Sequence, residues 1–88
     1  MDRTDRLRRL KFRAWHRGTR EADYVIGGFF DRHHAAWSES ELALAEALIE
    51  EDDAEILGWA FGTTPVPERY AGPLGDAIRR LDYVNIPR

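Results

Sequence analysis

The chain has 88 residues, contains no cysteine and carries a formal net charge of −3. This length predicts a single domain, and the lack of cysteine excludes disulfide frameworks and thiolate-based metal sites or nucleophiles. No apolar run approaches the ~20 residues that span a bilayer, and the charged N-terminus shows no signal-peptide or transit-peptide pattern, so we expect a soluble cytoplasmic protein.

Charge is divided unevenly along the chain. Residues 1–21 hold eight of the thirteen Lys and Arg residues but only three of the sixteen Asp and Glu residues. The remaining residues are therefore strongly acidic. Two arrangements are compatible with this division: a polar surface that recognises a partner of mixed charge, or two halves that complement each other within the fold.

The first predicted helix runs from about Asp5 to His16. Thr4 is placed to act as its N-cap. Apolar residues recur along it at helical spacing in a narrow stripe, and the rest of the helix is basic. Gly18 follows its end, where a left-handed residue commonly terminates a helix.

A second helix is predicted to start after Thr19, which can cap it, and to run to about His34. Its apolar residues cover much of its circumference, which predicts that it is largely buried. Gly27 and Gly28 lie in its interior, where each glycine lowers helix stability by ~1 kcal/mol. Close approach of another helix is the usual compensation for such glycines.

Three further helices are predicted in the second half of the chain. Ser38 opens a capping box with the glutamate three residues later, and the third helix follows. Asp52 marks the start of a short fourth helix, and Gly62 ends it. The fifth helix begins near Pro73. Residues 83–88 are predicted to form a C-terminal tail.

The predicted fold class is all-α. The connections are short and no alternating strand pattern occurs, which favours a compact five-helix bundle that forms one domain over residues 1–88. The predicted core consists of Leu10, Tyr24, Val25, Phe29, Leu42, Ala45, Leu48, Ile49, Ile56, Trp59, Ala60, Leu74, Ile78 and Leu81.

No catalytic or metal site is predicted. His33 and His34 are adjacent, so their side chains point about 100° apart on a helix and suit no shared metal ion. The chain offers no nucleophile paired with a base, and we expect a protein that is not an enzyme. The acidic run at residues 50–53 lacks the ligand spacing of an EF-hand loop, and we interpret it as a solvated helix junction.

A nucleic-acid interface on the basic first helix is the weaker alternative. Its arginines could follow phosphates, and Phe12 and Trp15 could stack on bases. The domain as a whole is acidic, however, which is contrary to the usual charge of such proteins. We therefore expect no nucleic-acid partner.

Arg17, Gly18 and Glu21 admit two interpretations. In the structural one, Gly18 ends a helix, Glu21 interacts favourably with the next helix dipole and Arg17 is its local ion-pair partner. In the functional one, a tight turn exposes guanidinium donors beside a carboxylate, and the patch binds a protein partner. The residues alone do not separate the two.

Residues 9–23, RLKFRAWHRGTREAD, closely resemble the SdhE family, also called succinate dehydrogenase assembly factor 2. Its R-G-x-x-E motif is matched by Arg17, Gly18 and Glu21, and its flanking basic, aromatic and acidic positions by Arg13, Trp15 and Asp23. Residues 53–59, DAEILGW, resemble the fourth helix of the family, and the resemblance covers roughly residues 5–82.

The resemblance implies a small five-helix protein of the bacterial cytoplasm or mitochondrial matrix. Such a protein would bind the flavoprotein subunit of succinate dehydrogenase, and in bacteria that of fumarate reductase, and promote covalent attachment of FAD to a histidine of this client. Contact residues would be Arg17, Gly18 and Glu21, with Asp23, Arg13 and Arg20 as weaker candidates.

The resemblance also suggests how the protein would act. We expect a monomer that holds no cofactor stably, because the FAD belongs to the client. On the functional interpretation, Arg17→Ala should leave the fold intact and weaken client binding. A helical interaction module for another partner is the remaining alternative.

Overall fold

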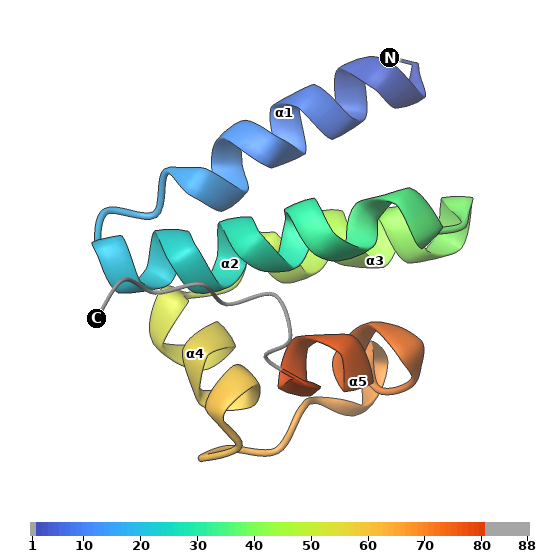
Figure 1. The fold of residues 1–88 in the computed structure, drawn as a ribbon. Helices are drawn as coiled ribbons and strands as arrows, with labels where there is room; N and C mark the ends of the chain where they lie inside the picture. The colour runs from blue at the N-terminus through green and yellow to red at the C-terminus, as the bar shows by residue number, and fades with distance from the viewer. Residues whose placement is uncertain (1, 81–88) are drawn as a thin grey trace.

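The computed structural model describes residues 2–80. Within this range the chain forms five α-helices and no strand: α1 (Arg3–Trp15), α2 (Arg20–His33), α3 (Glu39–Ile49), α4 (Asp53–Phe61) and α5 (Pro73–Arg80). Two short 3-10 helices, His34–Ala36 and Glu68–Tyr70, lie in the connections. The α2 helix is central, with α1 along one side, α3 behind it and α4 and α5 below it (Figure 1). The predicted all-α, five-helix architecture is confirmed.

The first helix begins earlier than predicted, and its cap is a different residue. The backbone N–H of Asp5 donates to the Asp2 carboxylate at 2.8 Å, while Thr4 lies inside α1. An aspartate at this position provides a side-chain acceptor and a negative charge that complements the helix dipole. The α1 helix ends at Trp15, one residue before the predicted end, and Gly18 has the predicted positive φ, +104°.

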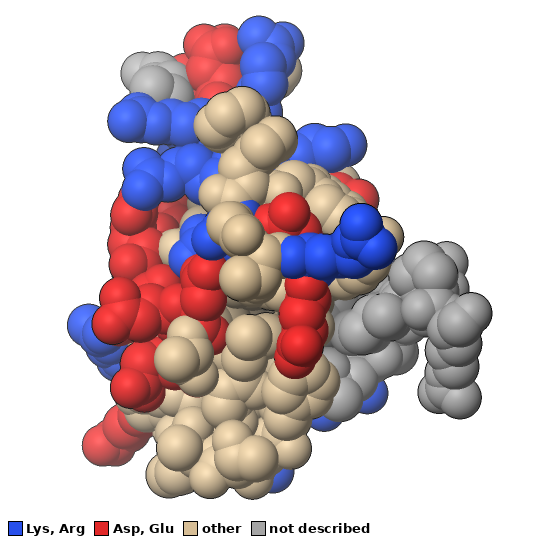
Figure 2. Space-filling view, turned by 90° about the vertical axis from the view of Figure 1, so that its left-hand side faces the viewer, with Lys and Arg blue, Asp and Glu red and all other residues tan. Residues whose placement is uncertain are grey.

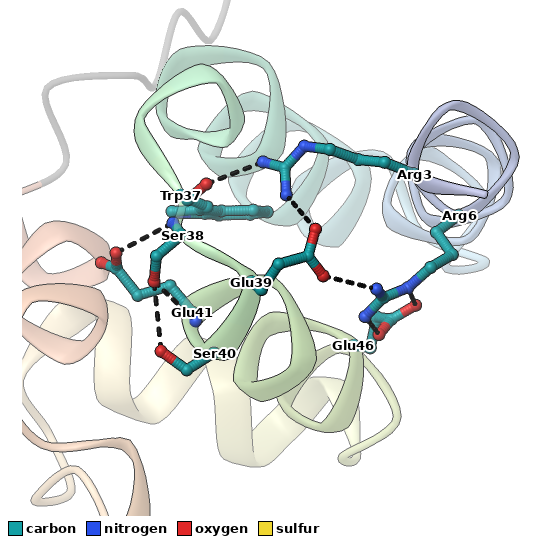
Figure 3. A network of polar contacts seen from close by, with 8 residues as sticks. All are labelled: Arg3, Arg6, Trp37, Ser38, Glu39, Ser40, Glu41 and Glu46. Atoms are coloured by element: carbon teal, nitrogen blue, oxygen red, sulfur yellow. Dashed lines mark hydrogen bonds and ion pairs between the residues drawn. The ribbon is translucent and has the colours of Figure 1, made fainter.

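The other helix starts follow the sequence closely. Thr19 caps α2, accepting from the Ala22 backbone N–H at 3.2 Å. The Ser38 capping box is also present, because Ser38 and Glu41 each bond the other's backbone N–H (Figure 3). Asp52 precedes α4 without a side-chain capping bond, and Gly62 ends this helix at φ +77°.

Most of the predicted core is buried, with one correction. Tyr24 is only half-buried, because it lies at the open edge of α2, where its ring meets Trp15 edge-on at 6.4 Å between centroids. Leu81 and the predicted tail lie outside the described residues. The sequence patterns missed two buried residues, Trp37 directly after the first 3-10 helix and Tyr70 at the end of the second, where no helical period extends.

Gly27 lies where Trp15 of α1 packs against α2. A Cβ atom on Gly27 would come within 2.2–2.7 Å of three atoms of the Trp15 indole. Only glycine leaves this space free, so the indole can pack flat against the α2 backbone. The close approach that the glycine pair predicts is thus confirmed at Gly27, and it fixes the end of α1 that leads into the next turn.

Candidate functional site

The N-terminal half of α1 is paired with α3. Arg6 binds Glu46 at 2.6 Å and Glu39 at 2.9 Å, and Arg3 binds Glu39 at 3.0 Å and the Trp37 carbonyl at 2.7 Å (Figure 3). The hydrogen bond that Arg6 donates to Glu46 raises the pKa of Arg6 above its usual value, and the hydrogen bond that Arg3 donates to Glu39 lowers the pKa of Glu39. Here the basic segment and the acidic half of the chain complement each other within the fold.

Arg17 continues this pairing at the turn between α1 and α2. Its Nε donates to Asp53 Oδ1 at 2.8 Å, and its two Nη atoms donate to the backbone carbonyls of Glu51 and Arg13 at 3.1 and 3.2 Å. The side chain is only 11% exposed. The expected Arg17–Glu21 pair is not formed, because Arg17 folds back along the last turn of α1 towards the α3–α4 junction. Arg17 thus ties the turn to this junction.

Asp23 holds the same turn from the other side. Its Oδ1 accepts the backbone N–H of Arg17 at 2.6 Å. Gly18 lies between these anchored residues, is exposed, and has no atom within 4 Å of the position a Cβ would take. Its need for glycine therefore comes from φ +104°, which L side chains rarely adopt, and not from crowding within the chain. The surface at Gly18 is open to a partner's backbone.

Glu21 and Arg20 face solvent in the first turn of α2. Neither makes an ion pair with any residue in the range 2–80. An exposed carboxylate and an exposed guanidinium next to an anchored turn can form charge-assisted hydrogen bonds with a partner at little ordering cost. Arg13 differs from them, since it binds Glu50 at 2.5 Å and is 43% exposed.

The acidic run at residues 50–53 is more than a solvated junction. Glu50 binds Arg13, and Asp53 binds Arg17. Glu51 accepts from the hydroxyl of Tyr70 at 2.7 Å and also binds Arg69. Figure 2 shows basic side chains over the upper part of this end of the molecule and acidic ones down its left-hand side. The run therefore joins α1 to the segment before α5.

Tyr70 makes this junction sensitive to alkali. Burial, together with the Glu51 hydrogen bond, raises the pKa of Tyr70 to about 12, whereas an unfolded tyrosine has a pKa of about 10. Between these values the unfolded state loses the proton and the folded state keeps it, so the free energy of unfolding falls as pH rises. We therefore expect the free energy of unfolding in urea to fall between about pH 10 and pH 12 for wild type, relative to Tyr70→Phe, which has no phenolic proton to lose. The same pH dependence of the free energy of unfolding in both proteins would contradict this.

The sequence-predicted site residues therefore fall into two groups, one that holds the turn and one that is exposed. It brings Arg13, Arg17 and Asp23 together around the turn, with Gly18 beside them. It leaves Glu21 and Arg20 pointing outward without a partner among the described residues. Sequence reasoning missed the partners Glu51 and Asp53, although the uneven distribution of charge already offered complementation within the fold as an interpretation.

Among residues 2–80, no group of three or more His, Asp or Glu side chains is placed to hold a metal ion. None of the helices in this range has the length and apolar character needed to cross a membrane.

Comparisons with known proteins give matches over most of the chain. The family described as "Flavinator of succinate dehydrogenase" matches residues 8–82. The "FAD assembly factor SdhE" of Acetobacter pasteurianus is 46% identical over 76 residues, which are 86% of this chain and 67% of that protein. The mitochondrial "Succinate dehydrogenase assembly factor 2" of Candida glabrata is 35% identical over 65 residues, and that of Saccharomyces cerevisiae 33% over 66. These fungal matches cover only 42% and 41% of the relatives' own length.

Proposed function

The chain belongs to the family of succinate dehydrogenase flavinators, and from this membership we propose that it binds the flavoprotein subunit of succinate dehydrogenase and promotes covalent attachment of FAD to it. One structural observation supports placing the client contact on the surface around the α1–α2 turn. The turn that bears the family motif is anchored by Arg17 and Asp23, while Glu21 and Arg20 beside it are exposed. A fixed turn with outward charges suits recognition of a folded client.

The protein acts on its client by binding and not by catalysis. It binds a minor conformation of the flavoprotein and raises the population of that conformation. In this state the FAD and the acceptor histidine of the client lie near attack distance, roughly 3–3.5 Å. The flavoprotein supplies the reacting groups and holds the FAD. The helper works as a cytoplasmic monomer, with the flavoprotein of fumarate reductase as a second client.

Within the motif, Glu21 makes the direct contact and Arg20 supports it. The Glu21 carboxylate accepts hydrogen bonds from client donors, and Gly18 allows the client backbone to approach the turn closely. Arg17, Asp23 and Arg13 contribute mainly by holding the turn in place. The exposure of the side chains and the bonds that each makes inside the fold support this division.

Binding to the isolated apo flavoprotein subunit tests the proposal. We expect Glu21→Ala to weaken the Kd about tenfold or more, equivalent to at least about 1.4 kcal/mol, and Arg20→Ala to weaken it less. Glu55→Ala is the matched control, because Glu55 is likewise an exposed acid in the first turn of a helix. Arg32→Ala serves the same purpose for Arg20 on α2.

The same measurement distinguishes the proposed function from an interaction module for another partner. Equal affinities for wild type and Glu21→Ala would remove the contact role of Glu21. A wild-type protein that does not bind the competent flavoprotein would favour an interaction module for another partner.

A further inference from the structure

An ordered aromatic platform lies on α1 beside the motif. The Phe12 side chain is 63% exposed, the highest value for a large hydrophobic residue within residues 2–80. Its ring stacks on His16 with 4.0 Å between centroids and 19° between planes. His16 Nδ1 lies 2.6 Å from the Phe12 carbonyl oxygen, a hydrogen bond that fixes the imidazole when this nitrogen carries the proton. The exposed platform is therefore already ordered.

A hollow lies on each side of this platform. One is bounded by Trp15, Asp31 and the stems of Arg8 and Lys11. The other is bounded by Arg9, Arg13 and the acidic run at residues 50–53. Figure 2 shows uncharged side chains among the basic ones on the upper part of this face. The platform thus stands as a ridge with space for a chain on either side.

The cations around Phe12 are less neutralised than the rest of α1. Arg9 is exposed and makes no ion pair within residues 2–80. Arg8 and Lys11 are 78% and 61% exposed, with acid partners only at 3.8 and 3.9 Å. By contrast, Arg6 and Arg13 hold their acids at 2.5–2.9 Å. This face can therefore attract a carboxylate from a partner.

The acidic run decides between a protein and a nucleic acid as the partner. Glu50, Glu51, Asp52 and Asp53 line the same hollow as Phe12 and Arg9. A polyanion that follows the basic side chains would bring successive phosphates against these carboxylates, which repel them. A protein segment that brings a single carboxylate to Arg9 and an apolar side chain to Phe12 meets much less of this repulsion than a row of phosphates does. Such a segment matches both the exposed ring and Arg9.

We propose that Phe12, His16 and Arg9 form a second contact for the client flavoprotein, which receives an apolar side chain flanked by an acidic residue. This inference rests on the proposed function for the identity of the partner. The apolar side chain packs on the Phe12–His16 stack, and the acid binds Arg9. The platform directly precedes the turn that presents Glu21, so the two contacts form one continuous surface along the end of α1 and the start of α2.

Affinity for the isolated apo flavoprotein subunit, measured by titration calorimetry, tests this contact. We expect Phe12→Ala to weaken the Kd about tenfold, as truncation of an aromatic anchor does, and Arg9→Glu to weaken it with a reduced dependence on salt. Phe61→Ala, which removes another exposed phenylalanine, and Arg32→Glu, which makes the same charge change on α2, should bind like wild type. Circular dichroism checks that all four variants fold.

The possible contrary results are distinct. Wild-type affinity in both Phe12→Ala and Arg9→Glu would overturn the platform and leave the proposed function standing. No binding by wild type would overturn both. Two further results would overturn the choice of partner: binding of a generic duplex oligonucleotide that Arg9→Glu abolishes, or self-association in sedimentation that Phe12→Ala abolishes.

Discussion

Replacing Arg17 with alanine is expected to lower the free energy of unfolding by about 2 kcal/mol. The change removes the ion pair with Asp53 and the hydrogen bonds to two backbone carbonyls. The Arg17 side chain is only 11% exposed, so solvent screens the pair weakly, although Asp53 at 31% retains some water. Urea unfolding at neutral pH measures the effect. We therefore add a loss of stability to the sequence-based expectation that Arg17→Ala leaves the fold intact and weakens client binding.

A double-mutant cycle with Asp53→Ala isolates the pair. We expect the double variant to be about 1–2 kcal/mol more stable than the sum of the single changes predicts, as is usual for residues in contact. Asp52→Ala is the matched control, because Asp52 is an exposed neighbour without a side-chain capping bond. Additive effects of Arg17→Ala and Asp53→Ala would show that the ion pair does not hold the turn.

Gly27→Val is expected to destabilise the fold by about 3 kcal/mol, the upper end of the range for overpacking. The added Cβ alone would meet the Trp15 indole at 2.2 Å. Replacing a glycine usually improves helix propensity, but valine offsets little of the cost in this way because its branched side chain is restricted in a helix. Trp15 must leave its position, and α1 then loses the packing of this indole on α2. Chemical unfolding of the purified variant measures the loss.

Removing the obstacle tests the cause of this effect. In a Trp15→Ala background the space next to Gly27 is free, so Gly27→Val should cost much less there than in wild type. A cost that is equal in both backgrounds would mean that valine acts through the α2 backbone and not through the indole. Trp15→Ala by itself should also be destabilising, because the indole is partly buried in the α1–α2 contact.

Regular helices were predictable because their signals are local. The Ser38 capping box, the Thr19 cap and the stop at Gly62 each depend on residues within one turn of the helix. Trp37 and Tyr70 were missed because they lie at the ends of 3-10 segments, where burial depends on which helices meet there and not on a period. The start of α1 was misplaced because Asp2 and Thr4 are both competent caps, and only the folded geometry selects Asp2.

The motif residues could be named from the sequence, but which of them the fold turns inward and which it leaves exposed could not. The motif Arg17, Gly18 and Glu21 can be read from the sequence. That Arg17 turns inward depends on Asp53, which is 36 residues away in the chain. Pairing over such a distance has no local signal, and only the uneven charge of the two halves indicates it. The exposure of Glu21 likewise depends on how α2 is oriented after the turn, and no local sequence signal gives this orientation.

Reconstituted flavinylation is the most direct test of the account. The apo flavoprotein subunit of succinate dehydrogenase is mixed with FAD, with and without this protein, and covalent flavin is read as in-gel fluorescence after denaturing electrophoresis. We predict more or faster labelling with wild type, a strong reduction with Glu21→Ala, and wild-type labelling with the control Glu55→Ala. Labelling that is unaffected by the wild-type protein, in a flavoprotein shown to be competent, would contradict the account.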